Sequence, residues 1–319
     1  MDPQEALILA VTAVRRASKV CQRVQADLVN AETLEKKDKS PVTVADFASQ
    51  AVICAALRDA FPDVPVVGEE GSAELRDGTH AALLASVATH AMLDEDAALE
   101  AIDFGAFDPV ADRDVRTYWT LDPIDGTKGF LRGEQYAVAL ALIEDGEVTL
   151  GVLGCPNLNG GVAMVARKGG GAERLALDGG ESFQGAPVRV SDEPIDNAKL
   201  CESVESGHSD HDASHRISEA LGITREPYRI DSQCKYAAVA MGLADVYLRL
   251  PTRPGYAEKI WDHAAGKLVV EEAGGTVTDI HGVAHDFGQG KTLRPDGGVV
   301  CTNGNFHNKV VDAVSAALA

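Results

Sequence analysis

One short segment of the chain combines acidic side chains with the residues of a tight turn. In WTLDPIDGTKG, residues 119–129, Asp122 and Asp125 flank a Pro–Ile pair and are followed directly by Gly126. Two carboxylates on one turn suit Mg²⁺, which prefers oxygen ligands and keeps waters that a phosphate can displace. A helix that begins near Gly126 would direct backbone N–H groups at an anion. The segment therefore predicts a metal site and a phosphate cradle on the same few residues.

Two other interpretations of this segment are open. Asp, Pro and Gly are common turn formers, so Asp125 and Gly126 could form a plain turn, with Asp122 as a helix cap. A phosphatase of the haloacid dehalogenase type would instead use an aspartate nucleophile in a D-x-D-G-T sequence. Here two residues separate the aspartates, giving D-x-x-D-G-T, which moves the second carboxylate away from the acid–base position. The spacing argues against an aspartyl-phosphate enzyme.

Three further acidic positions strengthen the prediction of a two-metal site. Glu69 and Glu70 follow the short apolar run 65–68, which is typical of a strand with carboxylates at its tip. Asp46 lies in SPVTVADFASQ, and Asp262 lies in WDHAAG. We expect Glu69 to be the ligand and Glu70 a solvated neighbour.

Asp46 and Asp262 also have simpler explanations. Asp46 lies three residues after Thr43 and could complete a capping box. Asp262 could be favourable only because it lies near a helix N-terminus.

The composition excludes several classes of partner. The 319 residues carry a formal net charge of −20 and are only 5% aromatic, which disfavours nucleic acid and anionic membranes. A small anionic substrate remains compatible if metal ions or a few Lys and Arg residues converge on it. The six cysteines are far apart and the N-terminus has no signal-peptide pattern. We expect a cytoplasmic monomer with reduced cysteines, and an organelle stays open if a transit segment was removed before Met1.

The elements that position these residues change in character near residue 194. The first part predicts helices over 2–28 and 43–60, then strands at 65–68, 118–121, 136–143 and 148–153. The second part alternates, with strands at 200–204, 245–250, 276–280 and 299–302 and helices at 213–221, 233–243, 261–273 and the C-terminus. We predict an α+β metal-binding lobe over 1–194 and a smaller α/β nucleotide-binding lobe over 195–319. The strongly acidic segment 93–116 is interpreted as an exposed loop.

Taken together, the motifs GEE, WTLDPIDGT and WDHAAG resemble the inositol monophosphatase superfamily, which includes fructose-1,6-bisphosphatase. This resemblance covers essentially the whole chain. It implies a layered α-β-α-β-α sandwich, Mg²⁺ dependence and inhibition by lithium.

Within the superfamily, the chain is most similar to the 3′(2′),5′-bisphosphate nucleotidases. The segments that carry this likeness are SPVTVADFASQ (40–50), VESGHSDH (204–211), DSQCKYAAVAMGLADVYLRL (231–250) and YAEKIWDHAAG (256–266). The resemblance implies hydrolysis of 3′-phosphoadenosine 5′-phosphate to AMP and phosphate, and action on the sulfated precursor as well.

The resemblance also implies roles for individual residues at the metal site. One Mg²⁺ would be held by Glu69, Asp122 and the Ile124 carbonyl, and a second by Asp122, Asp125 and Asp262, with room for a third near Asp46 and Glu69. Asp46 would help deprotonate a water activated by the metal ions, and Thr127 would orient it. The backbone N–H groups of Gly126 and Thr127 would hold the phosphate.

At the substrate end, the resemblance assigns the adenosine to His208, and the nucleotide with its second phosphate to Ser232, Lys235 and Arg249. From the residues alone, His208 could belong to a solvated loop. Lys235 could lie on an exposed helix face, and Arg249 on an edge strand.

Two other functions stay open. An inositol polyphosphate 1-phosphatase would share the metal residues and differ mainly around 208–249. A non-catalytic regulator that binds Mg²⁺ or a nucleotide could use the same fold, although the complete carboxylate set with Thr127 argues against it.

Overall fold

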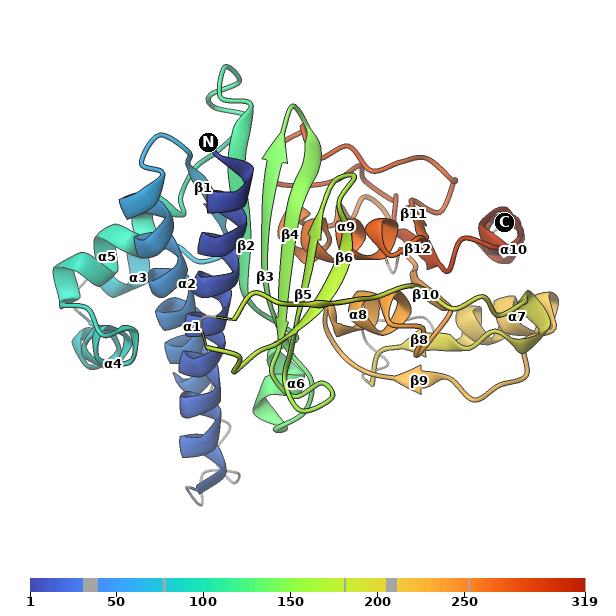
Figure 1. Ribbon diagram of the computed structural model, residues 1–319, viewed down its shortest axis with the longest axis horizontal. Helices are drawn as coiled ribbons and strands as arrows, with labels where there is room; N and C mark the ends of the chain where they lie inside the picture. Colours follow the sequence, from blue (N-terminus) through green and yellow to red (C-terminus); the bar gives the residue numbers. More distant parts are fainter. Residues whose placement is uncertain (31–39, 77–78, 181, 205–210, 252, 319) are drawn as a thin grey trace.

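The computed structural model of the chain is built from five layers in the order helices, sheet, helices, sheet, helices (Figure 1). It describes residues 1–30, 40–76, 79–180, 182–204, 211–251 and 253–318. A seven-stranded sheet, sheet A, forms the second layer and a five-stranded sheet, sheet B, forms the fourth. The predicted layered α-β-α-β-α sandwich is therefore confirmed.

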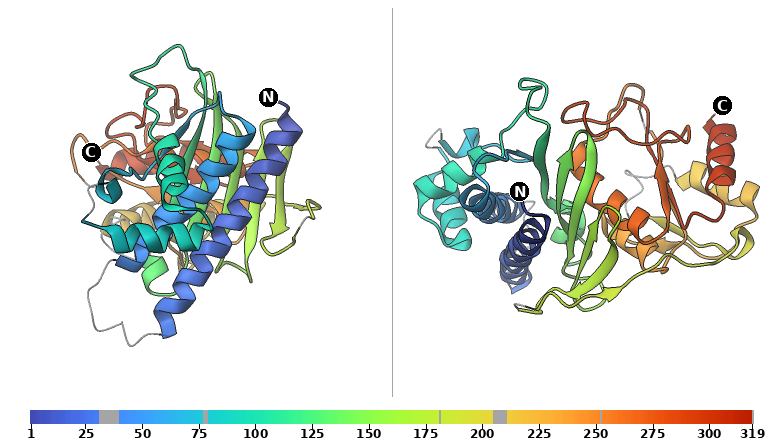
Figure 2. Two further views of the ribbon diagram at one scale, coloured as in Figure 1. Left: turned by 90° about the vertical axis from the view of Figure 1, so that its left-hand side faces the viewer. Right: turned by 45° about the horizontal axis from the view of Figure 1, so that its top comes forward.

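Two long helices form the first layer and cover one face of sheet A (Figure 2). They are α1 (Pro3–Asn30) and α2 (Ser40–Ala60). The Asp2 carboxylate caps α1, because its Oδ1 accepts hydrogen bonds from the backbone N–H groups of Gln4 and Glu5 at 2.8 and 2.9 Å. Small and aliphatic side chains at helical spacing then line the buried face of α1. These features confirm the N-terminal helix that the sequence predicts.

Sheet A contains the strands of the first half of the chain in sequence order. They are β1 (Val66–Gly68), β2 (Thr117–Asp125), β3 (Ala137–Glu144), β4 (Glu147–Cys155), β5 (Val162–Arg167), β6 (Gly171–Ala176) and β7 (Ala186–Pro187). β1 is parallel to β2, and every other neighbouring pair is antiparallel. The β3–β4 hairpin turns at residues 144–147, as predicted.

The middle layer separates the two sheets. It comprises α8 (Cys234–Ala240), the 3₁₀ turn η4 (Ile260–Asp262) and α9 (Ala264–Glu272). Glycine allows α9 to pack closely: a Cβ on Gly151 of β4 would lie 3.0 Å from the Ala265 carbonyl oxygen, and one on Gly266 only 2.2 Å from the Tyr236 ring. α9 therefore lies directly on β4 while it also contacts sheet B.

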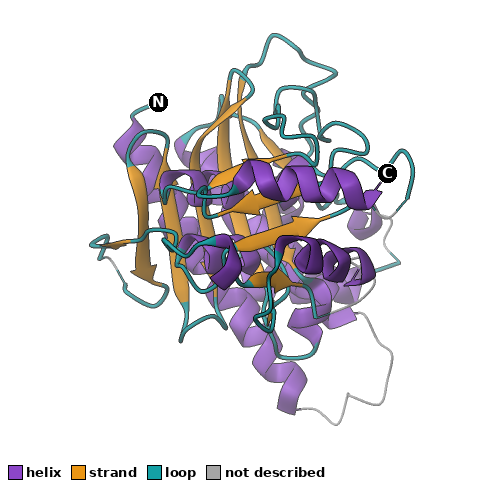
Figure 3. Cartoon of the chain, turned by 90° about the vertical axis from the view of Figure 1, so that its right-hand side faces the viewer, coloured by secondary structure: helices purple, strands orange, loops and turns teal. Residues whose placement is uncertain are grey.

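Sheet B contains β8 (Leu200–Glu202), β9 (Tyr228–Arg229), β10 (Val246–Arg249), β11 (Thr276–Thr278) and β12 (Val299–Thr302), in the order β11-β12-β10-β8-β9. The helices α7 (His211–Leu221) and α10 (His307–Leu318) form the outermost layer (Figure 3). The strands predicted near 200, 245, 276 and 299 are all present. The short 3₁₀ turn η2 (Ile195–Asn197) leads into this sheet.

The acidic segment 93–116 is not a loop throughout, and that prediction is wrong. Three helices that the sequence analysis did not assign precede β2: α3 (Ala73–Arg76), α4 (Ala81–Ala91) and α5 (Glu95–Phe104) (Figure 2). Asp94 caps α5 by accepting a 2.7 Å hydrogen bond from the Ala97 N–H. Leu99 and Ile102 are buried against α2. The many acidic residues hid an apolar face at helical spacing.

All six cysteines are free and buried, so the expectation of reduced cysteines is confirmed. Among the described helices, none is long and apolar enough to cross a membrane.

Candidate active site

A cavity of about 580 Å³ lies between the C-terminal end of β2 and the elements around β10 and η4. The predicted site residues that line it are Asp46, Glu69, Asp122, Ile124, Asp125, Gly126, Thr127, Ser232, Lys235, Arg249 and Asp262. His208, the remaining predicted site residue, lies outside the described residues. Segments more than 200 residues apart in sequence thus converge on one cavity.

A bulge at the end of β2 explains how both aspartates of the DPID turn reach this cavity. Residues three apart on a regular strand point to opposite faces. The register between β2 and β3 shifts between Asp122 and Asp125, which allows both side chains to line the cavity. Two hydrogen bonds hold the bulge: the Ile124 N–H donates to Asp122 Oδ1 at 3.1 Å, and Ser49 Oγ donates to the Pro123 carbonyl at 3.0 Å.

Two glycines allow the next element, α6 (Thr127–Leu131), to start beside α8. Gly126 has φ 90°, and a Cβ there would lie 2.7 Å from Ser232 Cβ. A Cβ on Gly129 would lie 2.1 Å from the Gln135 carbonyl oxygen. Close packing therefore requires both glycines of the DGTKG sequence, and the short helix predicted after Gly126 is present.

Four carboxyl groups crowd one side of the cavity. Burial and the charges of Glu69 and Asp125 raise the pKa of Asp122, which is only 3% exposed, well above its usual range. Burial and Glu70 raise the pKa of Glu69 to about 7, although Glu69 borders the open cavity. Burial and Asp125 raise the pKa of Asp262 to about 8. Such crowding is unfavourable unless a cation or protons neutralise it.

Asp46 approaches this cluster from α2. Its side chain is 7% exposed, and its pKa is raised well above the usual range by burial and by the charges of Glu70 and Glu69. A buried carboxylate that faces a cavity differs from a solvated carboxylate that only caps a helix. The Thr43 side chain, on which the capping-box interpretation depends, lies outside the described residues.

A buried glutamine of α2 holds the backbone that carries Glu69 and Glu70. Gln50 Nε2 donates to the Glu70 carbonyl at 2.7 Å, and the Glu70 N–H donates back to Gln50 Oε1 at 3.0 Å. A Cβ on Gly68 would lie 2.8 Å from the Gln50 amide, so glycine is needed for this approach. The two acidic residues thus extend from a fixed backbone rather than from a loose strand end.

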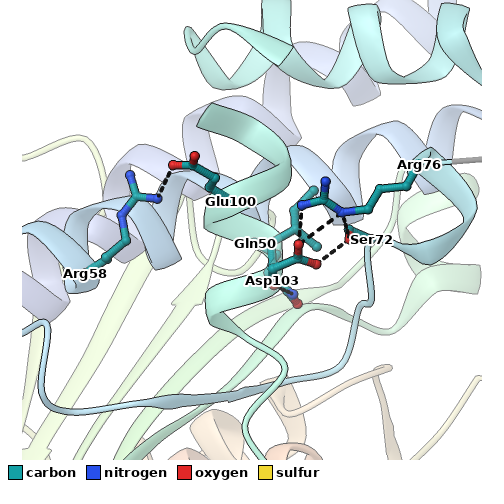
Figure 4. Close-up of polar contacts among 7 residues, drawn as sticks. Gln50, Arg58, Ser72, Arg76, Glu100 and Asp103 are labelled. Carbon is teal, nitrogen blue, oxygen red and sulfur yellow. Dashed lines mark hydrogen bonds and ion pairs between the residues drawn. The ribbon is translucent and has the colours of Figure 1, made fainter. Parts of the chain in front are cut away.

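The acidic segment also contributes to this support. Asp103, at the end of α5, accepts hydrogen bonds from the Ser72 hydroxyl and the Arg76 guanidinium, whereas Arg58 pairs with Glu100 farther along the helix (Figure 4). The Gly68 N–H donates to the Gly105 carbonyl at 2.8 Å. Residues 103–105 therefore fasten both ends of the 68–76 turn, a role that the sequence analysis did not assign.

Two basic side chains, Lys235 and Arg249, also line the cavity. Lys235 is 4% exposed, its Nζ lies 3.2 Å from Ser203 Oγ, and it lies 5.2 Å from the centre of the Tyr247 ring. Burial lowers its pKa. Arg249 lies on β10, which has neighbours on both sides in sheet B. The interpretations of Lys235 as exposed and of Arg249 as part of an edge strand are therefore wrong.

The sequence signature of the inositol monophosphatase family matches residues 2–319. The chain belongs to this family. A relative named 3′(2′),5′-bisphosphate nucleotidase from Schizosaccharomyces pombe is 43% identical over 338 residues, which cover 97% of this chain and 94% of the relative. A relative of the same name from Oryza sativa is 42% identical over 346 residues, which cover 98% and 94% of the two chains.

Solved structures of the inositol monophosphatase family share the fold. Inositol monophosphatase from Anabaena (Nostoc) sp. PCC 7120 has a TM-score of 0.67 at 22% identity and covers 99% of this chain and 97% of its own. CysQ from Bacteroides thetaiotaomicron, described as a bacterial member of the family, has a TM-score of 0.68 at 20% identity, with 95% and 98% covered.

Several cavity residues of this family member were not singled out from the sequence. The Gln233 N–H donates to Asp125 Oδ2 at 2.6 Å, and the Gln233 side chain donates to the Trp261 carbonyl at 2.9 Å, so Gln233 joins two acidic segments. Asp231 pairs with Arg132 and accepts a 3.0 Å hydrogen bond from the Val204 N–H. These residues adjoin the predicted Ser232, but no spacing rule distinguishes them from ordinary core residues.

Two further lining residues differ in how predictable they were. Tyr247 lies two positions before Arg249 on the same strand, so strand alternation could have identified it as a cavity residue. Ser203 follows β8 and has no comparable signal.

Proposed function

We propose that the protein is a Mg²⁺-dependent phosphomonoesterase that hydrolyses the 3′-phosphate of 3′-phosphoadenosine 5′-phosphate to AMP and phosphate. The observation that carries the proposal is the charged lining of this cavity: crowded carboxyl groups lie together with the buried Lys235 and the half-buried Arg249. A substrate with two phosphates matches this arrangement, one phosphate at the metal side and one at the cations. Nearly full-length relatives named 3′(2′),5′-bisphosphate nucleotidase support the same substrate.

The donor set fits Mg²⁺. Carboxylate and carbonyl oxygens are the ligands that this ion prefers, and burial together with the neighbouring carboxylates raises the pKa of Asp122 and of Asp262. Glu69, Asp122 and the Ile124 carbonyl would hold one ion, and Asp122, Asp125 and Asp262 a second. Bound Mg²⁺ would polarise the phosphoryl oxygens and stabilise the charge that develops during displacement. The proposal allows two or three ions.

Residues of the protein would accept the proton and bind the phosphate. Asp46 would accept a proton from the attacking water, and the Thr127 hydroxyl would orient that water. The backbone N–H groups of Gly126 and Thr127, at the start of α6, would hold the phosphate that is removed. No covalent phosphoenzyme is part of this proposal.

Lys235 and Arg249 would bind the second phosphate, with Ser232 as a neutral partner and His208 at the adenosine. The arrangement implies a substrate that spans the proposed lobes 1–194 and 195–319, because Asp262 of the second lobe reaches the metal side.

The proposal is tested by phosphate release from 3′-phosphoadenosine 5′-phosphate, inositol 1,4-bisphosphate and inositol 1-phosphate, each with Mg²⁺ and with a chelator. We expect Mg²⁺-dependent release with a clear preference for the nucleotide. Preference for an inositol phosphate would keep the metal site and overturn the substrate. Failure to hydrolyse any of the three would overturn the proposed activity and favour a non-catalytic regulator.

A further inference from the structure

Arg249 is held by a buried carboxylate that is not among the residues lining the cavity. Glu258 precedes η4 and is 4% exposed, and its Oε2 lies 2.9 Å from Arg249 Nε. The same oxygen lies 3.4 Å from His263 Nε2, and the Tyr236 hydroxyl lies 2.8 Å from His263 Nδ1. A buried chain from Tyr236 through His263 to Glu258 therefore fixes one side of the guanidinium.

A second carboxylate competes for the same guanidinium. Arg249 Nη2 lies 3.8 Å from Asp262 Oδ2, so Arg249 lies between Glu258 and Asp262 and is closer to Glu258. A guanidinium that paired fully with Asp262 would occupy its oxygens and cancel its charge. Asp262 would then be a poorer ligand for a divalent cation.

The cluster has an alternative explanation as a cation site of its own. The ligand atoms of Glu258, Asp262 and His263 all lie within 4.8 Å of one another. However, the Arg249 guanidinium already bonds to Glu258 and approaches Asp262, so a cation here would face a fixed positive charge. The geometry fits the holding of an arginine better than the binding of a metal.

We propose that Glu258 is a positioning residue that holds Arg249 away from Asp262, and so keeps the Asp262 carboxylate available for Mg²⁺. The inference rests on the proposed function in one respect, that Asp262 binds Mg²⁺. The contact with Glu258 explains how Arg249 can lie beside Asp262 without blocking it as a metal ligand. The N–H groups of Arg249 that are not used by Glu258 remain for an anionic ligand in the cavity.

The test is Mg²⁺ binding to the metal-free protein without substrate, measured by isothermal titration calorimetry in a double-mutant cycle. Glu258→Gln keeps the shape of the side chain and removes its charge, and we expect Mg²⁺ affinity to fall about tenfold as Arg249 moves onto Asp262. In the Arg249→Gln background the same change should alter affinity by less than about threefold. Asp145→Asn serves as the matched control, because it removes a carboxylate of the β3–β4 turn that pairs with Arg116. This change should leave Mg²⁺ binding unchanged.

An unchanged affinity in Glu258→Gln would overturn the proposal. So would an equal loss in both backgrounds, because Glu258 would then act on the cation directly through its charge. If Glu258→Gln does not fold, Glu258→Asp replaces it in both backgrounds, since the shorter side chain also weakens the contact with Arg249. A wild-type protein that binds Mg²⁺ but hydrolyses none of the three phosphates would overturn only the proposed function. A wild-type protein that hydrolyses the nucleotide while Glu258→Gln binds Mg²⁺ normally would overturn only this inference.

Discussion

At the scale of single residues, the proposed function gives different tasks to carboxylates that look alike in the sequence. Asp122 and Asp262 share a crowded cluster, whereas Asp46 approaches it from a helix of the first layer. Replacing the carboxylate by an amide should weaken Mg²⁺ binding at a residue that binds the metal, and should lower kcat at a residue that accepts a proton.

Asp46→Asn should lower kcat by about 10²–10⁴, the usual contribution of a general base, while the fold and much of the Mg²⁺ binding remain. Steady-state kinetics, circular dichroism and Mg²⁺ titration test this together. Asp59→Asn, an exposed change on the same helix, is the control. Activity of the Asp46 variant within a few-fold of wild type would remove this residue from the mechanism.

Lys235→Ala should raise KM for the bisphosphate by about 10–100-fold and change KM for a simple monophosphate much less. The magnitude corresponds to the loss of one charge-assisted hydrogen bond, about 1.5–3 kcal/mol. Because the side chain is buried, Lys235→Met should also be measured to separate lost charge from lost packing. Equal effects on both substrates would show that Lys235 does not bind the second phosphate.

At the scale of elements, the position of the two-glutamate turn depends on contacts that cross between helices. Gln50 of α2 bonds to the backbone of Glu70, and Asp103 of α5 bonds to Ser72 and Arg76 (Figure 4). These helices therefore support the metal side of the cavity from outside it, in addition to the Asp46 side chain of α2 that lines the cavity.

Gln50→Leu should lower the free energy of unfolding by about 2–6 kcal/mol, because two part-buried backbone groups of Glu70 lose their partner at about 1–3 kcal/mol each. Mg²⁺ affinity should fall as well, since the turn that carries Glu69 is released. Urea unfolding measures the first effect and calorimetry the second. Gln22→Leu, an exposed change on α1, is the control, and a loss no larger than that of Gln22→Leu would contradict the prediction.

The sequence analysis predicted helices and strands correctly where a periodic apolar pattern ends at residues that break a helix or strand. The β3–β4 hairpin, the layered fold and the positions of β8, β10, β11 and β12 are confirmed. Helix α5 was missed because four acidic residues are interspersed with its four buried apolar residues. Most of the charged residues that line the cavity were predicted from motifs. Gln50, Glu258 and the cavity residue Ser203 were not, because a contact between distant segments leaves no local spacing. The division at 194/195 and the catalytic roles stay predictions.

At the scale of the whole molecule, both the net charge and the crowded carboxyl groups of the cavity affect how stability changes with pH. The formal net charge of −20 counts every carboxyl group as ionised, including the buried carboxyl groups of the cavity whose pKa values are raised. Exposed carboxylates are already ionised above pH 6, so the buried cluster dominates how stability changes at higher pH.

The metal-free protein should lose stability as the pH rises from about 6.5 to about 8, because below this range the buried His285, with its pKa lowered to about 4, acts in the opposite direction. The folded-state pKa is about 7 for Glu69 and about 8 for Asp262, above their ordinary values of 4.5 and 3.8. In this window the folded state binds more protons than the unfolded state, so the free energy of unfolding falls as pH increases. Mg²⁺ should raise the Tm more at pH 8 than at pH 6, because the ion competes with protons for the same oxygens.

Thermal unfolding at a series of pH values, with chelator and with Mg²⁺, measures this dependence. Asp262→Asn removes one of the groups with a raised pKa and should flatten the metal-free profile. A metal-free Tm that increases between about pH 6.5 and pH 8 would contradict the prediction.

The strand order of sheet B has a consequence for how the protein folds during its synthesis. β12, at residues 299–302, lies between β10 and β11, so the strand that carries Arg249 lacks one neighbour until residues 299–302 have been synthesised. All strands of sheet A come from residues 66–187. We expect the nascent chain on the ribosome to complete sheet A first and to gain nucleotide binding only after β12 has emerged. Limited proteolysis of chains arrested at successive lengths would show sheet A protected before residue 302 has emerged, and simultaneous protection of both sheets would contradict this order.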